Sequence, residues 1–150
     1  MKTLRLYIDA SVIGGCFDEE FSEESCALLQ AAEEGKVTLI VSDLLALEME
    51  FAPPRVRDRF ASLPPDSLEP VLRTAESEGL RDAYLEAGVV GPRAANDAHH
   101  VALATVARAD VLVSWNFPHI VHLDKIRGFN AVNLKEGYGP IEIRSPREII

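Results

Sequence analysis

The sequence predicts a single α/β domain in which a small, mostly parallel sheet is flanked by helices. Two observations support this prediction: short apolar runs rich in β-branched residues have the length of buried strands, and longer segments of helical character separate them. Strands joined through helices pair in parallel, because such a connection crosses over the sheet. The 150 residues amount to one domain, and no repeat or linker divides 1–150.

The elements follow one another from the N-terminus. The first strand is expected at 4–8 and the second at 37–41, with a helix over about 21–34 that ends at Gly35. Ser42 is a good N-cap for the helix that follows it. Further helices are expected at 43–52, 55–63, 68–87 and 95–108. Further strands are expected at 111–114, 131–134 and 141–143.

The composition is that of an ordinary folded protein, with 47% hydrophobic and 26% charged residues. Cys16 and Cys26 have no CxxC spacing, so no disulfide framework is expected and a reducing compartment fits. Asp9 interrupts the apolar start of the chain, which argues against a signal peptide. No apolar run approaches the roughly 18 residues that span a bilayer. The sequence therefore predicts a cytoplasmic protein without a membrane segment.

The net charge of −9 limits how the chain can meet nucleic acid. Residues 1–92 hold 18 acidic and 8 basic side chains, and 18–34 hold seven acids and no base. Proteins that bind nucleic acid by charge alone usually present a basic face. If the chain acts on a polyanion, a bound cation is the expected source of attraction for phosphate.

Two polar residues follow predicted strands at the position where ligands sit in open parallel sheets. Asp9 follows the strand at 4–8, and Asn116 follows the strand at 111–114. Each also has a structural explanation: Asp9, with Ser11, could cap the next helix, and Asn116 could be a turn residue. For either residue alone the structural explanation is the better one.

Glu48 lies on the apolar face of its predicted helix. At 100° per residue it falls within the arc formed by Leu44, Leu45, Leu47, Phe51 and Ala52. A buried carboxylate is costly unless it is paired or bound to metal. The alternative to a functional role is an ion pair with an arginine of 55–59.

Asp97 lies at the start of the predicted helix at 95–108. An acid there is favoured by the helix dipole, by about 0.3–1 kcal/mol, so a structural role is plausible. Asp97 also shares a largely apolar face with His100, Val101 and Ala104. That face favours a functional role.

Together, the three carboxylates and Asn116 predict a metal site. Carboxylates that converge on one crevice raise each other's pKa unless a cation neutralises them. Oxygen ligands without soft donors suit Mg²⁺ or Mn²⁺. Such a site can activate water and stabilise the charge that builds on a phosphodiester. A zinc site built from the four histidines is not expected, because His99 and His100 diverge on a helix.

The chain also resembles the PIN-domain family. The matching segments are YIDASVI at 7–13, 42–48, NDAHHVALA at 96–104 and VLVSWNF at 111–117. The length resembles the VapC-type toxin ribonucleases of type II toxin–antitoxin modules. The resemblance implies a PIN-like three-layer domain, an endoribonuclease dependent on Mg²⁺ or Mn²⁺, a homodimer and an antitoxin partner. It assigns Asp9, Glu48 and Asp97 as metal ligands, with Asn116 at a fourth position where Asp is more common.

The leading hypothesis is RNA cleavage by metal-activated water at Asp9, Glu48, Asp97 and Asn116. Substrate-binding roles are expected for Ser11, Arg55, Arg57 and His100. Trp115 and Phe117 are expected to serve core packing more than base stacking. One alternative is a PIN-like binding or regulatory protein with a weak or inactive site, because Asn116 adds no charge. Another is a small-molecule phosphohydrolase, although no DxD motif follows the first strand.

Overall fold

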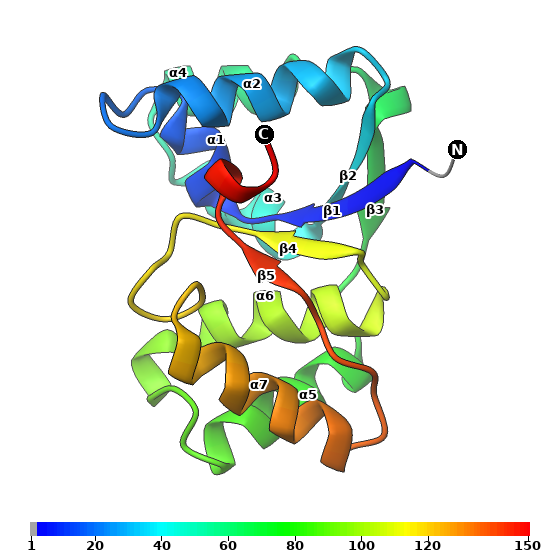
Figure 1. Cartoon of the computed structure of the whole chain (residues 1–150). Coiled ribbons are helices and arrows are strands. Elements are labelled where there is room, and N and C mark those ends of the chain that lie inside the picture. The colour runs from blue at the N-terminus through cyan, green and yellow to red at the C-terminus, as the bar shows by residue number, and fades with distance from the viewer. Residues whose placement is uncertain (1–2) are drawn as a thin grey trace.

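All five strands of the sheet run parallel, in the order β3-β2-β1-β4-β5 (Figure 1). This computed structural model describes residues 3–150. The strands are β1 (Leu4–Ile8), β2 (Val37–Ser42), β3 (Leu68–Val71), β4 (Val111–Val113) and β5 (Ile143–Arg144). The helices are α1 (Ala10–Gly15), α2 (Ser22–Glu33), α3 (Asp43–Glu50), α4 (Pro54–Ala61), α5 (Ala75–Glu86), α6 (Ala95–Val106) and α7 (Leu123–Lys135).

The sheet separates two hydrophobic cores, because successive side chains of a strand point to opposite faces. In β1, Leu6 and Ile8 pack with residues of α1 and α2, whereas Tyr7 packs with residues of α5, α6 and α7. Figure 1 shows the two groups of helices on opposite sides of the sheet. The predicted three-layer α/β fold is therefore confirmed.

The strand order reverses between β1 and β4. The chain runs from β1 to β2 and β3 on one side, then returns to place β4 on the other side of β1. The register places Ile8 beside Val113, so these two strands end together. Ligands of open parallel sheets bind outside the carboxyl ends of the strands at such a reversal. The left edge of the sheet in Figure 1 is this carboxyl edge.

Most of the predicted elements are present, but two assignments are wrong. The segment expected to begin a helix at 68 instead forms the strand β3, which lies at the edge of the sheet, where Pro70 is tolerated. The strand expected at 131–134 belongs to α7, because Phe129 and Val132 bury one helical face at a spacing of three. The short helix α1 was not among the predicted elements.

Within residues 3–150, none of the helices combines the length and apolar character needed to cross a membrane.

Candidate functional site

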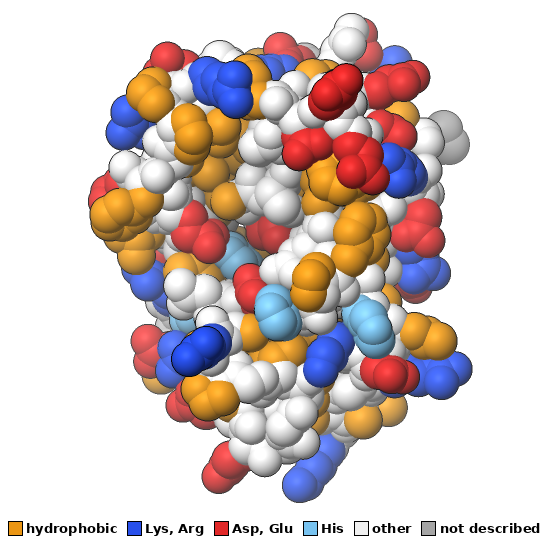
Figure 2. Space-filling model, turned by 90° about the vertical axis from the view of Figure 1, so that its left-hand side faces the viewer, with side chains coloured by type: hydrophobic (Ala, Val, Ile, Leu, Met, Phe, Trp, Pro, Cys, Tyr) orange, Lys and Arg blue, Asp and Glu red, His pale blue; other side chains and the backbone are white. Residues whose placement is uncertain are grey.

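A cavity of about 440 Å³ opens at the carboxyl edge of the sheet, beside the ends of β1 and β4. The four residues predicted as ligands all line it, together with Ser11 and His100: Asp9, Glu48, Asp97 and Asn116. Figure 2 views this face, where acidic and histidine side chains gather around a central hollow. Residues far apart in sequence therefore meet at one place.

Asp9 is almost fully buried, with 5% of its surface exposed. It is the N-cap of α1, and its Oδ1 accepts hydrogen bonds from the Ser11 amide at 3.1 Å and the Ser11 hydroxyl at 2.5 Å. Its Oδ2 accepts a hydrogen bond from the Ser114 hydroxyl at 2.6 Å. The capping role considered for Asp9 is thus present, and the same contacts hold its carboxylate at the cavity wall.

Ser114 links the segment after β1 to the segment after β4. It was not among the site residues predicted from the sequence. Its buried hydroxyl binds Asp9 and accepts a hydrogen bond from the Asn116 amide at 2.9 Å. The Trp115 amide donates to the Ser11 hydroxyl at 2.9 Å. The sequence places Ser114 at the end of the predicted strand at 111–114, but only the pairing of β4 with β1 brings it beside Asp9.

Asn116 is oriented by the turn that follows it. Its Oδ1 accepts a hydrogen bond from the His119 amide at 3.1 Å. Because a backbone N–H requires an acceptor, this contact assigns the oxygen to the turn and leaves the NH₂ group for other partners. The Asn116 side chain interacts with Asp97, whose carboxylate is a suitable acceptor. Asn116 therefore supports an acid in the cavity in addition to forming a turn.

Glu48 does not pair with an arginine of 55–59, which was the alternative considered for it; its hydrogen-bond partner is His100. His100 Nε2 lies 2.6 Å from Oε1 of Glu48, and the imidazole is 1% exposed. On its other side, His100 Nδ1 lies 2.6 Å from the Tyr7 hydroxyl. Helix α6 thus places His100 between the Tyr7 hydroxyl of β1 and the Glu48 carboxylate of α3.

The predicted apolar arc around Glu48 is partly wrong. Leu47 is 41% exposed and Phe51 is 84% exposed, whereas Met49 is buried. Helix α3 has only eight residues and ends before Phe51, so the extrapolated helical face does not continue to that residue. Glu48 itself is half-buried, which leaves part of its carboxylate open to the cavity.

The pKa of the Asp97 carboxyl group is raised above its usual value. Burial raises the pKa of its carboxyl group, the Asn116 side chain and His100 act against that rise, and the nearby charge of Asp9 adds to it. Asp97 lies in the first turn of α6 without capping that helix through its side chain. A carboxylate held under these conditions is one that a cation would stabilise.

The donor set fits a hard divalent cation, since carboxylate oxygens from three separate elements face one cavity. Across residues 3–150, no three Asp, Glu, His or Cys side chains are grouped tightly enough to enclose one ion. Two contacts explain this spacing: Glu48 lies against His100, and Asp9 is held by two hydroxyl groups. The side chains of Glu48 and Asp97 would therefore have to reorient to close the set around a metal.

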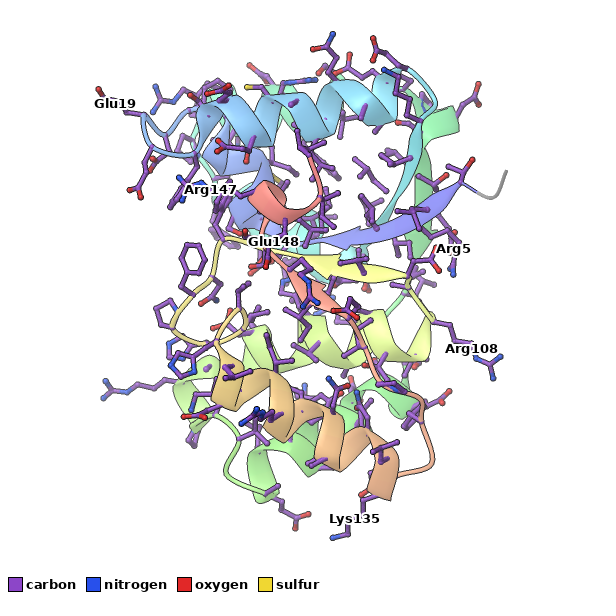
Figure 3. The ribbon with its side chains drawn as sticks, in the orientation of Figure 1. Arg5, Glu19, Arg108, Lys135, Arg147 and Glu148 are labelled. Atoms are coloured by element: carbon purple, nitrogen blue, oxygen red, sulfur yellow. The ribbon has the colours of Figure 1, made fainter. Side chains whose placement is uncertain are left out.

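The two predicted arginines lie outside the cavity lining. The guanidinium of Arg55 lies 5.3 Å from the centre of the Phe17 ring, and Arg57 donates to the Glu50 carbonyl at 3.4 Å. Another cation lies nearer: Arg147 lies over the rings of Phe21 and Trp115, both of which line the cavity. Figure 3 shows Arg147 beside the ends of α1 and α2, whereas Arg5 and Arg108 lie at the opposite edge of the sheet.

Trp115 has the packing role that the sequence predicts. It is 5% exposed, stacks on Phe21 with ring centres 4.1 Å apart, and donates from Nε1 to Ser25 at 2.7 Å. Phe117 differs, because 40% of its surface is exposed. Of the histidines, His99 is buried against Ser77, and His119 and His122 are exposed.

Comparisons with a family model and with solved structures both match this architecture. A family model described as a PIN domain matches residues 5–118, which is well over half of the chain. A solved structure of VapBC2 from Rickettsia felis, bound to a DNA fragment from its promoter, aligns with a TM-score of 0.56. The identity is 14%, and the alignment covers 95% of this chain and 98% of that one. A search of curated protein sequences finds no match. The fold, the family match and the ordered motifs together establish that this chain belongs to the PIN-domain family.

Proposed function

We propose that this chain is a metal-dependent endoribonuclease that cleaves RNA phosphodiester bonds with metal-activated water. PIN domains are generally metal-dependent nucleases, which supports hydrolysis as the reaction class. The observation that carries the proposal is the convergence of Asp9, Glu48 and Asp97 on one cavity at the strand reversal. The raised pKa of Asp97 supports it, because unneutralised carboxylates at this site are unfavourable.

In this proposal, Asp9, Glu48 and Asp97 hold Mg²⁺ or Mn²⁺ in the cavity. When bound, the ion lowers the pKa of its water and stabilises the charge that builds on the phosphate. The hydroxyls of Ser11 and Ser114 hold the Asp9 carboxylate in place by donating to its two oxygens. Asn116 offers its NH₂ group at the cavity wall, where it can orient water or a phosphate oxygen.

The RNA is proposed to cross the mouth of the cavity. Arg55 and Arg57 are exposed on α4 and can reach a phosphate backbone that extends beyond the lining residues. Ser11 and His100 line the cavity, where Ser11 is hydrogen-bonded to Asp9 and His100 to Glu48. These contacts favour a role in positioning the two acids over direct contact with the substrate. We therefore retain Arg55 and Arg57 as backbone contacts and assign Ser11 and His100 to ligand support.

The biological setting we propose is a toxin–antitoxin module in the cytoplasm, with this chain as the toxin. The VapBC2 likeness supports an antitoxin as protein partner. We also propose a homodimer, which light scattering at tens of micromolar would detect as twice the chain mass of 16.5 kDa. A single-chain mass at that concentration would contradict the dimer.

The test of the nuclease is cleavage of an RNA pool by purified wild type and Asp97→Asn in Mn²⁺, in Mg²⁺ and in EDTA. Asp58→Asn is the matched control, since it makes the same chemical change at an exposed residue of α4. Wild type and Asp58→Asn should cleave only with metal, and Asp97→Asn should lose at least about 100-fold in rate. Cleavage that Asp97→Asn retains in full would refute the assignment.

A second candidate function is binding without efficient catalysis. The observation in its favour is that Asn116 brings no charge and turns its oxygen to His119, so the fourth ligand position lacks the acid that is common there in the family. A calorimetric titration separates the two candidates. Micromolar binding of Mn²⁺ supports the nuclease, and absence of binding at several millimolar supports the binding protein.

A further inference from the structure

A continuous chain of hydrogen bonds runs from the Glu48 carboxylate back to the start of the helix that carries it. Glu48 Oε1 contacts His100 Nε2 at 2.6 Å, and His100 Nδ1 contacts the Tyr7 hydroxyl at 2.6 Å. The Tyr7 hydroxyl lies 2.9 Å from Oγ of Ser42. Ser42 is the N-cap of α3 and accepts the Leu45 amide at 3.0 Å. Four elements of the fold, β1, β2, α3 and α6, are joined by this chain.

The members of the chain beneath Glu48 are shielded from water. His100 is 1% exposed, Tyr7 is 0% exposed and Ser42 is 3% exposed. A buried polar atom that loses its partner carries a desolvation penalty, so each member fixes the position of the next. Both ring nitrogens of His100 are engaged, which fixes the imidazole plane and directs Nε2 at Glu48.

Glu48 has less local support than Asp9. Asp9 is held by backbone and hydroxyl donors at its own helix N-terminus, whereas Glu48 is a longer side chain that is half-buried. Glu48 contacts His100 through Oε1 and also lines the cavity, so Oε2 remains available to a ligand bound there. A histidine that holds one carboxylate oxygen while the other is available to a metal is a common outer-shell arrangement.

We propose that His100, Tyr7 and Ser42 form a positioning relay that aims the Glu48 carboxylate at the metal. This inference rests on the proposed nuclease function and assigns to it residues that do not touch the substrate. Tyr7 belongs to β1, so the strand that presents Asp9 at its end also fixes the orientation of Glu48. The relay thus couples the two carboxylates through the central strand of the sheet.

The test is the substitution Tyr7→Phe, which removes one hydroxyl and keeps the aromatic ring in the core. Tyr84→Phe is a matched control: Tyr84 is also 0% exposed, and its hydroxyl bonds Asn133 at 2.5 Å, away from the cavity lining. Both variants lose one buried hydroxyl, so both should lose similar stability in thermal melts. Only Tyr7→Phe should weaken Mn²⁺ binding by calorimetry, by about 10-fold.

Kinetics supply a second readout. At fixed low Mn²⁺, Tyr7→Phe should lower kcat for RNA cleavage and leave KM for RNA unchanged, and added Mn²⁺ should restore kcat. His100→Gln retains an N–H donor that can reach Glu48, whereas His100→Leu retains none. The relay therefore predicts tighter Mn²⁺ binding for His100→Gln than for His100→Leu.

Two results would overturn the relay in distinguishable ways. Mn²⁺ affinity of Tyr7→Phe equal to that of wild type and Tyr84→Phe would overturn the relay alone and leave the nuclease in place. A wild-type protein that neither binds Mn²⁺ nor cleaves RNA would overturn the proposed function, and the relay with it.

Discussion

At the scale of single residues, the site depends on hydroxyl groups that support acids. The Asp9 carboxylate is almost fully buried, and the hydroxyls of Ser11 and Ser114 donate hydrogen bonds to its two oxygens. Hydrogen bonds to a charged acceptor are stronger than those between neutral groups. Substitution of the serines that donate to Asp9 should therefore have a measurable effect.

Ser114→Ala should destabilise the protein by about 1–3 kcal/mol, because it leaves Oδ2 of Asp9 and the Asn116 amide without a partner. Ser67→Ala is the control, since Ser67 is also buried but binds only the Pro64 carbonyl, remote from the cavity lining. Urea unfolding gives the stability of each variant. Equal losses for the two variants would contradict the special role of Ser114.

The sequence predicted the site acids better than their partners. Asp9, Glu48 and Asp97 were identifiable because each occupies a position of known meaning, a strand end or a helix face. Tyr7 and Ser114 were not, because their roles depend on which strands pair and in what register. A tyrosine within an apolar strand is ordinary core, and only the packing of α6 shows that its hydroxyl meets His100.

At the scale of elements, α1 must approach Trp115 closely. A Cβ at Gly15 would lie 2.4 Å from Oγ of Ser25 and 2.7 Å from Nε1 of Trp115. These two atoms are hydrogen-bonded to each other at 2.7 Å, so neither can move away without losing that bond. Gly15 thus allows α1, α2 and the loop after β4 to meet beside the cavity.

Gly15→Ala should therefore cost about 1–3 kcal/mol of stability through overpacking. Gly14→Ala is the matched control in the same helix, because nothing lies within 4 Å of a Cβ at Gly14. That change should be neutral or stabilise by up to about 1 kcal/mol, since alanine favours helix. Chemical denaturation of both variants distinguishes crowding from a general effect on α1, which would change both alike.

An ion pair between β1 and β3 lies at the edge of the sheet opposite the cavity, so its loss should affect stability and not the site. Arg5 of β1 donates to both carboxylate oxygens of Glu69 in β3, at 2.8 and 2.5 Å. Its guanidinium also bonds the carbonyls of Ala107 and Arg108, at the turn that precedes β4. Figure 3 places Arg5 away from the edge where the cavity opens.

The hydrogen bonds and charge of Arg5 hold the pKa of the Glu69 carboxyl below its usual value. A lowered folded-state pKa adds stability above the unfolded-state value of 4.5, and that stability is lost as pH falls through the folded-state pKa. Glu69→Gln should cost up to about 1 kcal/mol at pH 7, because both side chains are about one-third exposed. The difference from wild type should shrink below pH 4 in urea titrations, and a constant difference would contradict the charge effect.

The two misassigned segments show what local patterns leave out. The run at 131–134 has the composition of a short strand, but it continues the helical face that Ile126 and Phe129 begin. The segment 68–71 contains a proline, which disfavours a central strand, yet β3 lies at the sheet edge. In both cases the position of the segment in the fold, which the local pattern does not contain, determined its secondary structure.

At the scale of the whole molecule, the net charge of −9 limits how the proposed RNA substrate could be attracted. A basic surface that neutralises many phosphates makes binding strongly dependent on salt. A site that relies on a divalent ion should instead show a shallow dependence. Binding of a short labelled RNA, measured by anisotropy in Ca²⁺ to limit cleavage, should give a log–log salt slope smaller in magnitude than about 3. A steep slope, or equal binding in EDTA, would indicate an unrecognised basic surface.

The central claim is that metal-activated water, positioned by Asp9, Glu48 and Asp97, cleaves RNA. The most direct measurement maps the end groups left when wild type and an Asp9→Asn/Asp97→Asn double variant act on a defined RNA in Mn²⁺. Attack by water leaves a phosphate monoester on one fragment and a hydroxyl on the other, and we expect these ends from wild type alone. A 2′,3′-cyclic phosphate, or equal cleavage by the double variant, would show that the ribose hydroxyl or a contaminating enzyme does the chemistry and would contradict the account.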